Sequence, residues 1–179
     1  SSDSRLSYCA STSGETESMS PMSISGSSPA ASKASSPLSA AMEKYKSDMA
    51  EMFSLHEQSA KTAEKVNQYA EKASVRLNAL IEETTLPSAS FALNALREQL
   101  DAVLQSVDNV SAENAESRKR LTADFAALKK AQNAAKQAEM INTKQLKNVI
   151  AAISGLDEEI NRKLKIDTAL REKMRAVSA

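Results

Sequence analysis

Residues 38–80 read LSAAMEKYKSDMAEMFSLHEQSAKTAEKVNQYAEKASVRLNAL, and this stretch decides the fold class. Its apolar residues recur at alternating steps of four and three, with Glu, Lys, Gln and Ser between them. Thirteen consecutive positions follow this spacing, which we call the first seam: Leu38, Met42, Tyr45, Met49, Met52, His56, Ser59, Ala63, Val66, Ala70, Ala73, Leu77 and Leu80. A seam that keeps a period of 3.5 residues over this length is typical of a coiled-coil helix.

Two prolines delimit the first helix. Ser36 is a suitable N-cap, and Pro37 is a suitable first helical residue because its missing N–H needs no partner there. The residue before Pro87 is pushed away from helical geometry, so the helix should end near Leu86. We therefore expect a first helix over 38–86, followed either by a hairpin corner or by a kink in one longer rod.

A second seam runs through residues 87–179, which we expect to form one long helix. It begins apolar and becomes small and polar in its middle: Leu93, Leu96, Leu100, Val103, Val107, Val110, Asn114, Ser117, Leu121, Asp124, Leu128, Ala131, Ala135, Ala138, Asn142, Gln145 and Val149. The register then changes by a stutter, which locally unwinds a supercoil. Residues 154–155, Ser-Gly, are a possible break, but the periodicity crosses them and favours a continuous or gently bent helix.

Several seam positions are polar, and these have two readings. Polar residues in a seam lower stability but restrict the register and the choice of partner. Alternatively, they mark a loosely packed zone that is open to water. The residues concerned are His56, Ser59, Asn114, Ser117, Asp124, Asn142 and Gln145.

The two expected helices differ in length, and this difference predicts a binding surface. If the chain folds back at Pro87, a helix over 38–86 covers only about half of a helix over 87–179. The rest of the second helix then exposes its apolar stripe, and such a stripe on a lone helix binds another helix. The expected partner-binding seam is Val149, Ile153, Leu156, Ile160, Leu164, Leu170 and Met174.

Residues 1–37 differ from the rest of the chain in composition. Fifteen of these 37 residues are serine and few are apolar, so the segment is predicted to be a disordered tail. Three serines precede prolines and are possible phosphorylation sites: Ser20, Ser28 and Ser36. Ser-Pro pairs also arise by chance in a serine-rich segment.

The charges are divided unevenly, although the 23 basic and 23 acidic residues balance overall. Residues 1–117 carry 9 basic and 16 acidic residues, whereas residues 118–179 carry 14 basic and 7 acidic ones. The basic half either forms solvated faces and interhelical pairs or binds a polyanion such as nucleic acid or an acidic filament. The first reading is favoured, because acids interrupt the basic stretch. Possible polyanion contacts are Arg118, Lys119, Arg120, Lys129 and Lys130.

No catalytic or metal-binding pattern emerges from the sequence. His56 is the only histidine and Cys9 the only cysteine, which leaves no expected nucleophile–base pair, zinc site or internal disulfide. The three glycines form no phosphate-binding loop. We therefore expect no enzyme activity, no cofactor and no small-molecule substrate. No signal peptide or membrane span is visible, which favours an intracellular protein of the cytoplasm or nucleus.

These observations predict an all-α protein with a structural role. We expect long coiled-coil helices, as a helical hairpin or a kinked rod, after a disordered serine-rich tail. The predicted function is an elongated scaffold or tether that binds other coiled-coil chains in a homo- or hetero-oligomer. This layout is typical of kinetochore, chromosome-axis, cytoskeletal and nuclear-pore assemblies. The alternative is a coiled-coil dimer whose basic half binds microtubules or nucleic acid directly.

Overall fold

The computed structural model describes residues 36–178, and every regular element in that range is an α-helix. The helices are α3 (Pro37–Glu83), α4 (Pro87–Asn109), α5 (Ala115–Gln137) and α6 (Thr143–Ser178). The prediction of an all-α fold is confirmed. The predicted disordered tail, residues 1–37, lies outside the described residues except for its last two.

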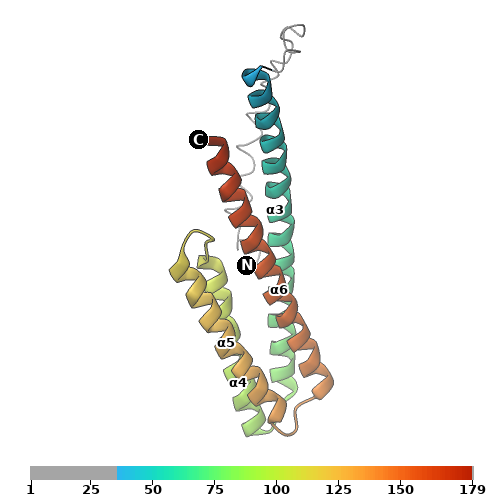
Figure 1. Cartoon of the computed structure of the whole chain (residues 1–179). Coiled ribbons are helices and arrows are strands. Elements are labelled where there is room, and N and C mark those ends of the chain that lie inside the picture. The colour runs from blue at the N-terminus through green and yellow to red at the C-terminus, as the bar shows by residue number, and fades with distance from the viewer. Residues whose placement is uncertain (1–35, 179) are drawn as a thin grey trace.

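Helix α3 begins and ends close to the predicted positions. The Ser36 hydroxyl accepts a hydrogen bond from the Ser39 backbone N–H at 3.1 Å, as an N-cap does, and Pro37 is the first helical residue. The helix ends at Glu83, and α4 begins at Pro87. The interruption therefore lies where the proline predicts it, and the chain reverses direction there in a hairpin corner (Figure 1).

The prediction of one second helix over 87–179 is wrong, because two further corners divide this region into α4, α5 and α6. At the first corner, Asn114 caps α5: its side-chain oxygen accepts from the Ser117 N–H at 3.1 Å. At the second, Asn142 accepts from the Gln145 N–H at 3.2 Å, just before α6. The possible break at 154–155 does not occur: α6 continues through Ser154 and Gly155, in agreement with the favoured interpretation of a continuous helix.

Helices α3 and α6 form the long axis of the molecule and run antiparallel (Figure 1). Near the start of α6, the Arg76 side chain donates to the Asn148 carbonyl at 3.5 Å. Near its end, Lys173 donates to Asp48 at 3.2 Å. The last part of α3 therefore lies beside the start of α6, and the end of α6 lies beside the first part of α3.

Helices α4 and α5 form a shorter antiparallel hairpin that packs along one part of this pair (Figure 1). The four helices share one apolar core, built from both predicted seams and from α6. Its fully buried large side chains are Leu77, Leu80, Leu93, Leu96, Leu100, Leu128, Leu156, Val66, Val103, Val107 and Val149. The molecule is therefore a four-helix bundle at one end, beyond which the α3–α6 pair continues and the first turns of α3 extend past the end of α6 (Figure 1).

Candidate functional site

The α4–α5 hairpin stops short of the first part of α3. Its corner, residues 110–114, reaches α6 through an ion pair of 3.4 Å between Glu113 and Arg171. Two residues further along α6, Lys173 contacts Asp48 and Glu51 of α3. Residues 37–51 of α3 therefore lie beyond the hairpin, and we call them, with residues 172–178 of α6, the uncovered end.

The uncovered end exposes apolar side chains that belong to the first seam. Met52 is 7% exposed, and the same seam is fully buried deeper in the bundle. Beyond the hairpin, Leu38 is 73% exposed, Met42 47% and Tyr45 46%, with Met174 of α6 at 45%. The seam does not end where the covering helices end, so it leaves an apolar stripe facing solvent. Sequence analysis placed these α3 residues in a seam but did not predict that they are its exposed part.

A cluster of charges joins the two helices at this end. Asp48 accepts from Lys44 at 3.0 Å and from Lys173 at 3.2 Å, and Lys173 also pairs with Glu51 at 2.7 Å. The hydrogen bond from Lys44, followed by that from Lys173, lowers the pKa of Asp48. Glu51 and then Asp48 raise the pKa of Lys173. The stabilisation from Asp48 is therefore present at neutral pH and is lost as the pH falls below 3.8.

A buried polar cluster lies between α3 and α6, closer to the four-helix part than the charges at the uncovered end. The Lys163 ammonium donates to Ser59 at 2.9 Å and to Asp167 at 2.6 Å, and the Ser59 hydroxyl donates to Asp167 at 2.7 Å. Ser59 and Lys163 are each 4% exposed. The nearby His56 has a lowered pKa because burial opposes its charge, although Asp167 opposes that shift.

This cluster favours one alignment of α3 with α6, and its Ser59 hydroxyl is not placed to act as a nucleophile. A one-turn slip between the helices would separate Ser59 from Lys163 and leave buried polar groups unpaired, which is costly. The Ser59 hydroxyl is buried and its hydrogen is donated to Asp167, so it is not presented to a substrate. Of the two readings of the polar seam positions, a register device fits Ser59. Sequence analysis did not identify Asp167 as its partner, because residues 108 positions apart share no local pattern.

The predicted partner-binding seam on α6 is mostly buried within the chain itself. Val149, Ile153, Leu156 and Ile160 are at most 3% exposed, and Leu164 packs against the same core. The expectation that this stripe is exposed to solvent is wrong for these five residues, because the corner at residues 138–142 folds α6 back along α3. At the end of the stripe, Leu170 is half-buried and Met174 is exposed.

The possible polyanion contacts all lie on α5. Arg118 is half-buried and donates to the Ala112 carbonyl at the α4–α5 corner, so it holds that corner. Lys119, Arg120, Lys129 and Lys130 are exposed, and none forms an ion pair within residues 36–178. These four side chains are available to a ligand from solution.

Of the three possible phosphorylation sites, the structure describes one. Ser20 and Ser28 lie outside the described residues. Ser36 is half-buried, and its hydroxyl oxygen caps α3. A phosphate on this hydroxyl would place negative charge at a helix N-terminus, where the helix dipole favours it.

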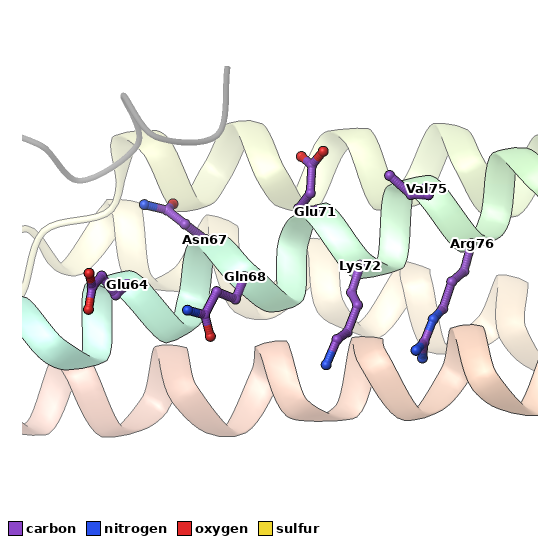
Figure 2. Close-up of a pocket in the computed structure, with 7 residues that line it drawn as sticks. All are labelled: Glu64, Asn67, Gln68, Glu71, Lys72, Val75 and Arg76. Atoms are coloured by element: carbon purple, nitrogen blue, oxygen red, sulfur yellow. The ribbon is translucent and has the colours of Figure 1, made fainter.

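A surface groove runs along α3 in the four-helix part, and Figure 2 shows the seven side chains that line it. All seven are on α3 itself: Glu64, Asn67, Gln68, Glu71, Lys72, Val75 and Arg76. In Figure 2, Lys72 and Arg76 extend toward α6, whereas Glu71 and Val75 point the other way. These side chains diverge, so the groove does not assemble an acid, a base and a nucleophile around one point.

Within residues 36–178, no three His, Cys, Asp or Glu side chains come together in a way that could hold a metal ion. The same residues contain no helix with the length and apolar character needed to cross a membrane. In comparisons with known proteins, no family model matches the chain, and neither the curated proteins nor the solved structures contain a significant match.

Proposed function

We propose that the chain is a structural subunit that joins other helices at its uncovered end. The observation that carries this proposal is the apolar stripe of Leu38, Met42 and Tyr45 on α3, together with the exposed Met174 near the end of α6. Exposed apolar surface that continues a buried seam is typical of a site for another helix, which would pack its own apolar face into the stripe. In this proposal the helices pack as a coiled coil, with seam residues of one helix between those of the next.

The cellular role proposed here is an elongated intracellular scaffold or tether. Helix α3 has 47 residues, which corresponds to about 70 Å of rigid rod at 1.5 Å per residue. This helix runs from the four-helix part to the uncovered end, so a partner bound at the uncovered end would be held at one tip of an elongated molecule. Kinetochore, chromosome-axis, cytoskeletal and nuclear-pore assemblies use subunits of this kind. The proposal assigns the protein no enzymatic activity.

A test of this role measures incorporation into an assembly in cells. The tagged full chain is expected to elute in fractions well above its own mass of 19.2 kDa when a gentle lysate is fractionated by size. Met42→Lys combined with Tyr45→Lys should shift it to small fractions, because both charges fall within the stripe. Phe91→Lys is the matched control, since Phe91 is 78% exposed but lies on α4 in the four-helix part. Wild type found only in small fractions would contradict the proposal.

A second candidate function is polyanion binding through α5. This helix carries six basic and two acidic residues, and one of the acids, Asp124, already accepts a hydrogen bond from Ser106. The exposed Lys119, Arg120, Lys129 and Lys130 would then contact phosphates or the acidic surface of a filament.

Salt dependence tests this second function. Binding to labelled double-stranded DNA or to microtubules should weaken steeply between low and moderate salt. Lys129→Glu combined with Lys130→Glu should weaken binding at least tenfold. Lys165→Glu, an exposed site on α6, is the control for added negative charge. No binding to either polymer at low salt would eliminate this candidate.

A further inference from the structure

We propose that α5 binds double-stranded DNA by lying in its major groove. This inference rests on the second candidate function, in which exposed basic residues of α5 bind a polyanion. It adds the class of polymer, the groove, and the side of the helix that enters it. The proposed scaffold role at the uncovered end does not depend on it.

The buried residues of α5 define which side of this helix faces outward. Leu121, Leu128 and Ala135 are at most 4% exposed and lie on one line along the helix, which faces the core. At about 100° per residue, Lys119 and Lys130 lie on the opposite line, and both side chains are exposed. Their Cα atoms are about 16 Å apart along the helix axis, since each residue adds about 1.5 Å. The outer line of α5 therefore carries a cation at each end of a three-turn stretch.

Basic side chains also lie on both flanks of this outer line. Arg120 is rotated by about 90° to one side and Lys129 by about 90° to the other, and both are exposed. Neither forms an ion pair with another residue in the described part of the chain. The surface of a filament contacts mainly one line of a helix, whereas a DNA groove has a row of phosphates on each side. Cations on the outer line and on both flanks therefore fit a groove better than a filament.

The outer line is also narrow between its two cations. Ala123 and Ala126 lie there and are exposed, so no long side chain keeps the helix away from the floor of a groove. The major groove of B-form DNA is about 12 Å wide and admits an α-helix, whose diameter is about 10–12 Å. The major groove of duplex RNA is too narrow for this, so the geometry favours DNA over RNA.

The acidic residues of α5 leave this surface basic. Asp124 accepts a hydrogen bond from Ser106 of α4, so its carboxylate is directed toward the neighbouring helix. Glu116 lies in the first turn of α5, before the basic residues begin. Contacts from Lys119, Arg120, Lys129 and Lys130 to phosphates should together give a slope of about −4 when the logarithm of the binding constant is plotted against that of the salt concentration.

Titration of a labelled DNA duplex with the full chain, at several salt concentrations, tests the contact on both flanks. Arg120→Ala combined with Lys129→Ala should reduce the steepness of the salt dependence by about 2 and weaken binding at least about tenfold near 100 mM salt. Lys165→Ala, at an exposed position of α6, is the matched control and should leave binding unchanged. Alanine favours helix, so circular dichroism should show both variants folded. A folded double variant that binds as tightly as the wild type would overturn the inference.

Dimethyl sulfate tests the groove, because it methylates guanine N7, which lies in the major groove. The bound chain should protect N7 at saturating protein, and a duplex RNA of the same sequence should bind at least about tenfold more weakly. Unprotected N7, or equal binding to the two duplexes, would contradict the inference. Binding to microtubules but not to DNA would also overturn it and leave the second candidate function in place, whereas binding to neither polymer would remove both.

Discussion

Replacing Gly155 with alanine should destabilise the protein, although Gly155 lies inside helix α6. The reason is the ring of Tyr69 on α3, which packs directly over the glycine. A Cβ added at residue 155 would lie 2.7 Å from Tyr69 Cδ1 and Cζ and closer still to Cε1. These separations are shorter than real carbon–carbon contacts, so the ring or the α6 backbone must move.

Two opposing free energies set the size of the effect. Alanine stabilises a helix interior by about 1 kcal/mol relative to glycine. Overpacking of a well-packed contact typically costs about 1–3 kcal/mol. Tyr69 packs against the core, and its ring lies 5.4 Å from the Lys72 ammonium, so moving the ring outward loses apolar and cation–π contact. We expect Gly155→Ala to lower the free energy of unfolding by about 1 kcal/mol net.

The decisive observation is that the effect of Gly155→Ala on the free energy of unfolding changes sign when Tyr69 is also replaced. In a Tyr69→Ala background the clash is absent, so Gly155→Ala should raise the free energy of unfolding by about 1 kcal/mol. Urea denaturation followed by circular dichroism, at one low protein concentration, measures all four variants. Ser154→Ala, at an exposed neighbouring position, is the control for helix propensity and should stabilise by about 0.5 kcal/mol in both backgrounds. Equal stabilisation by Gly155→Ala with and without the tyrosine would refute this reasoning.

Three further predictions concern caps, buried charges and pH. Asn114→Ala should lower the free energy of unfolding by about 1 kcal/mol through loss of the α5 cap, whereas Asn133→Ala, exposed in mid-helix, should not lower it in the same urea assay. Asp167→Asn should lower the free energy of unfolding by about 2–3 kcal/mol, because the buried Lys163 ammonium loses this carboxylate. Lys163→Met should lower it by about 1 kcal/mol, because water reaches the Asp167 carboxylate. Equal losses of stability in the two variants would contradict this prediction. Burial lowers the pKa of His56 below 6.5, so the unfolded state binds its proton more readily and stability should fall as the pH drops through that value. His56→Gln should remove this part of the pH profile of unfolding, and an unchanged profile would exclude His56 as its source.

The buried residues and the first corner could be predicted from the sequence. Leu77, Leu93 and Leu100 are at most 1% exposed and lie at seam positions, because the period of 3.5 residues records which face a helix buries. Pro87 marks a corner because a proline constrains the residue before it regardless of tertiary context. Both signals are local, so one sequence is sufficient to read them.

The two later corners could not be predicted from prolines and glycines, because neither corner contains one. The chain turns at Met140 with φ of 64°, a backbone conformation in which glycine or asparagine is expected. Asn114 and Asn142 fall at seam spacing, so they read as polar seam residues although they cap helices. The pair Asn142 and Gln145 resembles a capping box, and that signal could have located the start of α6.

The missed corners explain why most of the candidate site lies on the first turns of α3, whereas the predicted site lies in the C-terminal half and shares Met174 with it. With one helix over 87–179, the surplus apolar length falls on the C-terminal half. Once that region folds into helices of 23, 23 and 36 residues, α3 with 47 residues becomes the longest element. Since Lys173, near the end of α6, lies beside Asp48, the surplus must fall on the first turns of α3. Leu38 and Met42 are exposed because of this difference in length, since their spacing is the same as that of the buried seam residues.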